Sequence, residues 1–228
     1  MCNLIKKFNS IAIALLGVYA VLFSPLAIEH VYAVQVLDYN ETTHLQFMRE
    51  EEKLAHDVYA TFATQYPQAK VFQNITESEQ RHTSAVKNVL DYYEIPDPSI
   101  SDFVGVFTGD EWGWYFTEKF SELVGMGSEN LLSALYVGAL IEELDMHDIA
   151  YCPEVIVEES EAIENLEECG YVYTDEEAIR GLYQYLLSGS ENHLRAYVKN
   201  IEKIIGEGNY EAQYLTQEEV DDILGRGE

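Results

Sequence analysis

Glu79 and His82 are three residues apart in the stretch ITESEQRHTSAV, which otherwise has the pattern of an amphipathic helix. Side chains at this spacing project from one helical face, so this carboxylate and this imidazole could meet the same ion. Both lie in the middle of an otherwise largely apolar inner row: Phe72, Ile75, Glu79, His82, Val86, Val89 and Tyr93. Because burying a charge is costly without a partner, the pair needs a basic side chain or a metal ion.

Polar residues recur on the predicted inner faces of four helices. These candidate metal ligands are Glu52, Glu79, His82, Glu142, His193 and Asp145. A single inner Glu is usually paired with Lys or Arg, and a lone inner His is usually a satisfied core residue. The chain has only 13 Lys and Arg, however, and the predicted inner rows contain none of them. Carboxylates with one or two imidazoles suit iron or manganese, whereas zinc more readily takes nitrogen and sulfur ligands.

The stretch REEEKLA has three consecutive carboxylates, and only one of them can lie squarely on the inner stripe of its helix. Glu52 completes the row between Met48 and Ala55. Glu51 remains the alternative.

Apolar spacing predicts an all-α protein of four long helices, because no strand pattern of useful length competes. Asn74 and Glu77 have the spacing of a capping box and are expected to open the second helix. A longer connection between the second and third helices predicts a bundle with one crossover connection. The predicted elements are long helices over residues 40–65, 72–93, 131–149 and 175–205, a connection over 94–110, a short aromatic helix near 112–123, and one short helix in the tail at 209–228.

The first 33 residues have the features of a secretory signal peptide. Lys6 and Lys7 precede an apolar run, and Val31 and Ala33 occupy the small-residue positions before a cleavage site. An uncleaved anchor is the alternative, but a Ser-Pro pair interrupts the run. We therefore expect a secreted, periplasmic or cell-surface protein whose helical domain spans 34–208, with no membrane association after cleavage.

The formal net charge is −28, and 47% of the residues are hydrophobic. This composition is that of a globular chain, and its charge repels nucleic acid and gives no attraction to anionic lipid. The expected charged partners are cations.

Cys152 and Cys169 form an even pair once Cys2 is removed with the signal, so a disulfide between them is expected in an oxidising compartment. They bound an acidic segment near 151–174 with seven glutamates, which are too costly to bury together. We expect a solvated excursion. A calcium site is not favoured, because the spacing of an EF-hand loop is missing.

At the candidate metal ligands the sequence resembles the ferritin-like superfamily of di-iron carboxylate four-helix bundles. Glu79-x-x-His82 matches the second-helix motif, and Glu52 with Ala55 and Tyr59 matches the first-helix pattern, which favours Glu52 over Glu51. Glu142-x-x-Asp145 is similar to the third-helix pair of rubrerythrins. The blocks MREEEKLAHDVY, FQNITESEQRHTSAV, ALYVGALIEELDMHDI and LLSGSENHLRAYV resemble an uncharacterised branch known only as a ferritin-like domain of unknown function.

The resemblance implies one or two iron ions, with manganese as the alternative, and oxidation of ferrous iron or reduction of oxygen or peroxide. One departure is Ser190, which stands where the fourth helix should carry a glutamate. Glu191 lies about 200° around the helix from His193, so it reaches the site only if it turns inward. Either Glu191 or Asp145 would complete the site. A non-catalytic extracellular structural or binding protein is the alternative function. The acidic insertion argues against a storage cage, while an oligomer remains open.

Overall fold

The computed structural model describes residues 36–227, which are all helix, turn and loop with no strand among them. The predicted signal peptide at 1–33 lies outside the described residues. The elements are α1 (Tyr39–Gln65), α2 (Lys70–Tyr92), α3 (Gly113–Gly127), α4 (Leu131–Ala150), α5 (Glu154–Glu159), the 3-10 helix η1 (Leu166–Glu168), α6 (Glu177–Ile205) and α7 (Gln217–Ile223). The expected all-α class is therefore confirmed.

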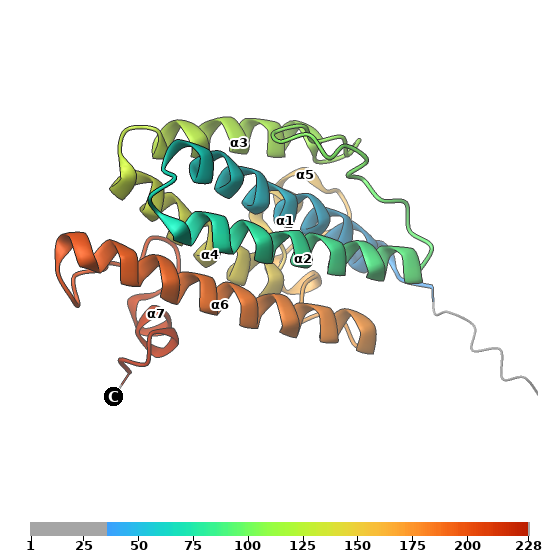
Figure 1. Cartoon of the computed structure of the whole chain (residues 1–228). Coiled ribbons are helices and arrows are strands. Elements are labelled where there is room, and N and C mark those ends of the chain that lie inside the picture. Colours follow the sequence, from blue (N-terminus) through green and yellow to red (C-terminus); the bar gives the residue numbers. More distant parts are fainter. Residues whose placement is uncertain (1–35, 228) are drawn as a thin grey trace, which may run out of the picture. The chain divides into compact units, whose positions relative to one another are not determined.

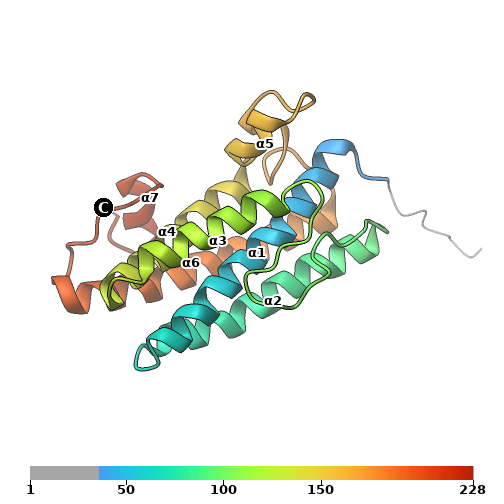
Figure 2. The same ribbon diagram turned by 90° about the horizontal axis from the view of Figure 1, so that it is seen from above.

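The four longest helices pack around a shared interior. α1 packs along α2, α2 contacts α6, α6 packs along α4, and α4 contacts α1 (Figure 1). The connection from α2 to α4 carries α3, which packs on the outside against α1 and α4 (Figure 2). Each of the four helices turns one face towards the interior of the helical ring that α1, α2, α6 and α4 form.

The helix ends follow local chemistry in most places. Asp38 caps α1 by accepting a hydrogen bond from the backbone N–H of Glu41 at 2.8 Å, and the two residues form a capping box. The predicted capping box at Asn74 and Glu77 is wrong, because α2 already begins at Lys70 without a side-chain cap. The earlier start places Val71 and Phe72 in the core, and this burial outweighs the missing cap.

The two short predicted helices are present. The aromatic segment forms α3, which buries Trp112 at its N-cap and leaves Trp114 about half exposed. The tail contains α7, which begins with a capping box between Thr216 and Glu219.

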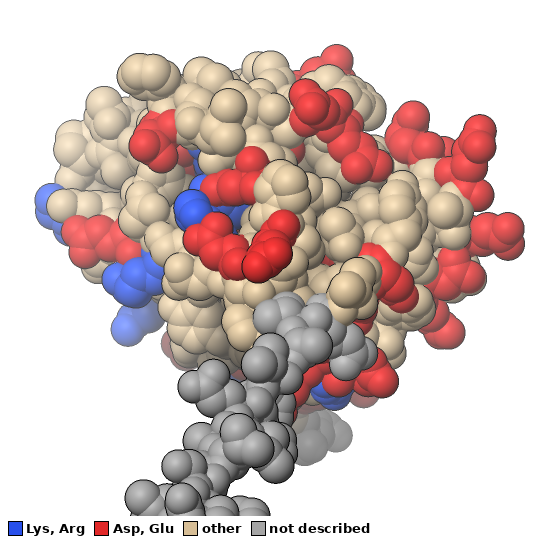
Figure 3. Space-filling model, turned by 90° about the vertical axis from the view of Figure 1, so that its right-hand side faces the viewer, with Lys and Arg blue, Asp and Glu red and all other residues tan. Residues whose placement is uncertain are grey.

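The acidic segment is solvated, as its composition predicts. Six of its seven glutamates are exposed, and Glu168 is half-buried. A disulfide joins Cys152 to Cys169, whose side chains are buried, and Ile156 and Ile163 attach the segment to the core. Figure 3 shows several groups of acidic side chains on one face of the molecule, set among other residues and with fewer Lys and Arg.

Within residues 36–227, no helix combines the length and the apolar character needed to cross a membrane.

Candidate metal centre

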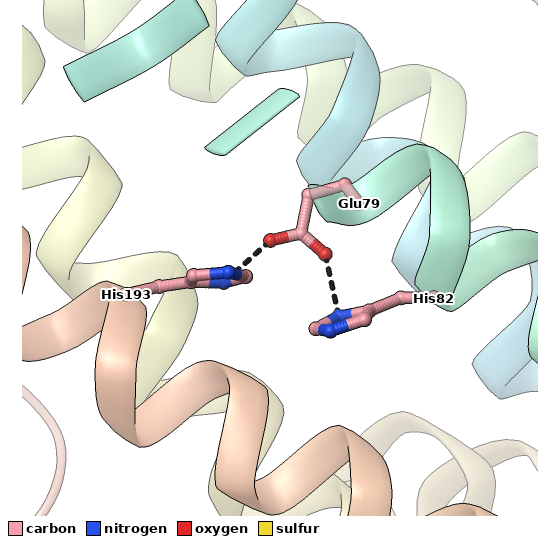
Figure 4. A group of neighbouring side chains, drawn as sticks. All are labelled: Glu79, His82 and His193. Atoms are coloured by element: carbon pink, nitrogen blue, oxygen red, sulfur yellow. Dashed lines mark ion pairs between the residues drawn. The ribbon is translucent and has the colours of Figure 1, made fainter. Parts of the chain in front are cut away.

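Three side chains meet inside the helical ring: Glu79 and His82 from α2 and His193 from α6 (Figure 4). Glu79 Oε2 lies 2.8 Å from His82 Nδ1, and Glu79 Oε1 lies 2.7 Å from His193 Nδ1. One ligand atom from each of the three residues lies within 4.8 Å of the others. A single carboxylate thus faces both imidazoles.

Two further glutamates flank this group. Glu52 Oε2 from α1 lies 3.3 Å from His82 Nδ1, and Glu142 Oε2 from α4 lies 3.3 Å from His193 Nδ1. Each imidazole is therefore placed between the central Glu79 and one outer glutamate. All four long helices contribute to this arrangement.

Asp145 from α4 is the sixth member. It is 5% exposed and accepts a hydrogen bond from the Ser190 hydroxyl of α6. Glu191 instead lies on the surface, where its Oε2 is 3.0 Å from the Arg195 guanidinium. The structure therefore brings together all six predicted residues, and the carboxylate that accepts from Ser190 in the interior is Asp145, whereas Glu191 points to the surface.

The polar atoms at the centre are poorly satisfied by the protein. His82 Nδ1, His193 Nδ1, Glu52 Oε1 and Glu79 Oε1 are buried, and among residues 36–227 none of them finds a hydrogen bond of ordinary geometry. The close nitrogen–oxygen contacts therefore do not follow the N–H directions of the rings. Since buried polar atoms are rarely left without a partner, this donor set fits a bound cation.

Each of the two imidazoles forms a charge pair with Glu79. Burial by itself would raise the pKa of Glu79, but His193 and His82 outweigh it and lower the pKa to about 2. Burial would likewise lower the pKa of both histidines, yet the carboxylates raise it to about 12 for His82 and about 10 for His193. Charged imidazoles thus supply the positive charge that a bound cation would otherwise supply to Glu79.

The other three carboxyls of the centre, those of Glu52, Glu142 and Asp145, have too few positively charged neighbours to offset their burial. Burial raises the pKa of Glu52 to about 7, although His82 opposes this rise. Burial also raises the pKa of Glu142. Burial raises the pKa of Asp145 well above its usual value, and the nearby Glu52 and Glu142 add to this rise. A divalent cation would relieve this excess of negative charge.

The nearby buried basic residues are already occupied. Arg49 Nε lies 3.1 Å from Asp97, and Lys53 pairs with Asp57 one helical turn away. Neither pair includes a member of the six-residue centre. The shortage of basic partners inferred from the sequence is therefore present in the structure at this site.

Two supporting residues fix the ligands. The Tyr59 hydroxyl donates a 2.6 Å hydrogen bond to Glu142 Oε1, so this buried tyrosine orients a predicted ligand. Gly189 on α6 lies against the His82 ring, and a Cβ at this position would be 2.3 Å from His82 Cε1. Gly189 was not predicted, although a glycine inside a helix is a signal of close approach.

The three consecutive glutamates of α1 are all buried, but of the three it is Glu52 that lies against His82 of the centre. Glu50 accepts a 2.9 Å hydrogen bond from the Gly109 N–H, Glu51 lies against Asp148, and Glu52 faces His82. α1 is covered by α2, α3, α4 and the connection after α2, so successive residues each meet a different neighbour.

The sequence model described as "Uncharacterized protein domain (DUF2202)" matches residues 41–226, which include the whole centre. The chain belongs to the DUF2202 family. This DUF2202 protein is 38% identical over 190 residues to the uncharacterized protein MJ0754 of Methanocaldococcus jannaschii, covering 83% of this chain and 89% of the relative. The crystal structure of hypothetical protein MJ0754 is similar with a TM-score of 0.68, over 84% of this chain and 95% of that one.

Proposed function

We propose that this DUF2202 protein is a ferritin-like four-helix bundle that binds a transition metal between α1, α2, α4 and α6. In bundle di-iron proteins, two helices each give a Glu and two others each give a Glu-x-x-His. Glu52 and Glu142 fit the first role, and Glu79 with His82 fits the second. On α6, His193 is in place, and Asp145 of α4 supplies the carboxylate beside Ser190.

The observation that carries the proposal is the position of Glu79 between two imidazoles from different helices. Glu52, Glu79 and His82 would hold one ion, and Glu142, Glu79 and His193 a second. Iron suits this set of carboxylates and imidazoles, and manganese fits it as well. Bound iron would supply redox chemistry with oxygen or peroxide, including oxidation of ferrous iron.

The protein around the site would serve two purposes. All six residues are at most 7% exposed, so the chain keeps bulk water away from the ligands. Tyr59 holds Glu142 in one orientation through its hydroxyl. Such fixed outer partners tune ligand position and metal affinity.

We also propose that the protein is exported after removal of residues 1–33 and functions as a secreted, periplasmic or cell-surface protein. The disulfide between Cys152 and Cys169 supports an oxidising compartment. The partners would be metal ions with oxygen or peroxide, and the acidic chain would not bind nucleic acid.

The test is metal analysis of the chain isolated without chelator after growth with iron, manganese or zinc. We expect about two iron atoms per chain. Glu79→Gln should lose most of the bound metal with the helical content retained, because it removes the carboxylate shared by both histidines. Glu50→Gln is the matched control, since Glu50 is equally buried but binds Gly109. No metal in the parent chain, or equal loss in both variants, would contradict the proposal.

Ser190 favours one alternative, a non-catalytic extracellular structural or binding protein that keeps the bundle without a working di-iron centre. The fourth helix lacks the usual carboxylate, and the charged histidines can neutralise Glu79 without a metal. A parent chain that stays folded and metal-free in all three supplements would favour this alternative.

A further inference from the structure

A cavity of about 290 Å³ lies where α3 covers α1 and α4, and neither His82 nor His193 lines it. Its walls are largely apolar and include Leu54 from α1, Phe116 and Leu123 from α3, and Ile141 and Leu144 from α4. This size is near the lower end for pockets that take small organic molecules.

Two carboxylates that do not belong to the candidate metal centre line this apolar cavity. Glu51 and Asp148 are 8% and 7% exposed and lie against each other. Asp148 Oδ1 has a partner in His147 Nδ1 at 2.9 Å. Glu51 Oε2 is buried and accepts no hydrogen bond from the residues that the structure describes, while the Asp148 carboxyl lies within hydrogen-bond reach of the Glu51 carboxyl. An unpaired carboxylate oxygen therefore remains in an apolar cavity.

Charges around the cavity favour a cation. Lys119 is the basic residue among those that line it, and its Nζ lies 3.0 Å from Glu122 on the exposed face of α3. Glu154 of α5 adds a further exposed carboxylate to the lining. A molecule that enters thus meets an acidic end and apolar walls.

We propose that this cavity binds a small primary ammonium compound with an apolar body. The ammonium group would donate hydrogen bonds to Glu51 and Asp148, which satisfies the unpaired Glu51 oxygen. The apolar body would lie along Leu54, Ile141 and Leu144. An ammonium carries three donors and no acceptor, so it matches two adjacent carboxylates, whereas an anion would be repelled. Ammonium binding does not require a metal at the candidate metal centre, although Asp145 and Glu52 of that centre lie near enough to act on Glu51 as charges.

Isothermal titration of the full chain with hexylammonium tests the proposal. Hexanoate has a similar apolar tail with the opposite charge, and the ammonium ion has the head without the tail. We expect saturable one-to-one binding of hexylammonium, no binding of hexanoate, and binding of the ammonium ion weaker by roughly tenfold or more, because burial of the tail is lost. Equal binding of hexylammonium and hexanoate, or no binding of hexylammonium, would overturn the proposal.

Three substitutions test whether hexylammonium binds in this cavity. Glu51→Gln should weaken hexylammonium binding by roughly tenfold or more, because it removes a charged acceptor in a buried site. Glu118→Gln removes the same charge from an exposed position on α3 outside the cavity and should leave binding unchanged. Val155→Trp, which fills the cavity from α5, should also block binding and serves if Glu51→Gln does not fold. Equal effects of Glu51→Gln and Glu118→Gln would mean that only surface charge attracts the ligand.

Metal content and hexylammonium binding, measured on the same variants, test whether the cavity and the metal centre are independent. Glu51→Gln should keep the metal of the parent chain, and Glu79→Gln should keep hexylammonium binding. Loss of hexylammonium binding in Glu79→Gln would contradict the independence of the cavity from the metal centre.

Discussion

Buried acids in this protein differ in what satisfies them. Glu143 and Glu202 each accept hydrogen bonds from backbone N–H groups, as Glu50 does from Gly109. Glu52 and Glu79, by contrast, face imidazoles and accept no backbone hydrogen bond from the described residues. The residue type is the same in both groups, so only the partner distinguishes a structural carboxylate from a candidate ligand.

His44 shows the corresponding contrast for histidine. Its Nε2–H donates to the Asp148 carbonyl at 2.7 Å, and its Nδ1 accepts from the Tyr183 hydroxyl at 2.6 Å. This arrangement satisfies a neutral ring with one donor and one acceptor. No carboxylate outweighs the burial, which lowers the pKa of His44 to about 4.

The buried neutral His44 predicts a loss of stability in acid. The unfolded chain takes up this proton near the ordinary pKa of 6.5, whereas the folded chain takes it up only at about 4. The contribution to stability is thus fully present above pH 6.5 and declines as the pH falls towards 4. Between about pH 7.5 and about pH 5 this one group should cost the folded state roughly 2 kcal/mol.

Urea unfolding of the parent chain and of His44→Gln at both pH values measures this contribution. The variant should be less stable near neutral pH, but it should lose roughly 2 kcal/mol less than the parent on acidification. An identical loss in the two proteins would assign the pH dependence to other groups.

At the scale of the element, α6 places two glycines in contrasting surroundings. A Cβ on Gly181 would meet no atom within 4 Å, whereas a Cβ on Gly189 would lie 2.3 Å from His82 Cε1. The helix therefore needs glycine at only one of these two positions, where it approaches a candidate ligand of α2.

The two alanine substitutions should therefore have opposite effects. Gly181→Ala should raise the free energy of unfolding by about 1 kcal/mol, because alanine favours the helix and meets no clash. Gly189→Ala should lower it by about 1–3 kcal/mol, because the new methyl displaces the His82 ring. Thermal unfolding measures both effects.

Metal content provides a second measurement on the same pair. Gly189→Ala should reduce bound metal, while Gly181→Ala should leave it unchanged. If Gly189→Ala retains full metal content, the ring position set by this contact is not needed for binding.

At the scale of the whole molecule, Glu143 attaches the C-terminal segment to α4. This fully buried carboxylate accepts hydrogen bonds from the Tyr210 hydroxyl at 2.6 Å and from three consecutive backbone N–H groups, those of Gln213, Tyr214 and Leu215, at 2.9, 2.7 and 3.0 Å. A segment that lies far from α4 in sequence is thus held by one side chain.

Glu143→Gln should destabilise the protein by about 2 kcal/mol or more, because an amide cannot replace a charged acceptor for these donors. The segment should also become accessible to protease before the four long helices unfold. Glu211→Gln, at an exposed position in the same segment, is the control and should change neither property. Unfolding free energies and limited proteolysis with mass analysis of the fragments provide the measurements.

The sequence by itself determined the all-helical class and much of the centre. Helical spacing placed Glu79, His82, Glu142 and His193 on inner faces, because a period of 3.6 residues fixes which side chains share a face. The family resemblance, not the spacing, favoured Glu52 over Glu51. The same spacing located the long helices, since long periodic segments are constrained by their own pattern. It misplaced the start of α2, where burial of Val71 and Phe72 overrides a local capping signal.

Only the tertiary structure decided which neighbour each inner side chain meets. Glu50, Glu51 and Glu52 are adjacent in sequence, yet they face a loop, a carboxylate in an apolar cavity, and a histidine. Asp145 lies beside Ser190, while Glu191 lies on the surface. Periodicity fixes the direction of a side chain relative to its own helix, but the axial position and rotation of the packed helices determine what lies there.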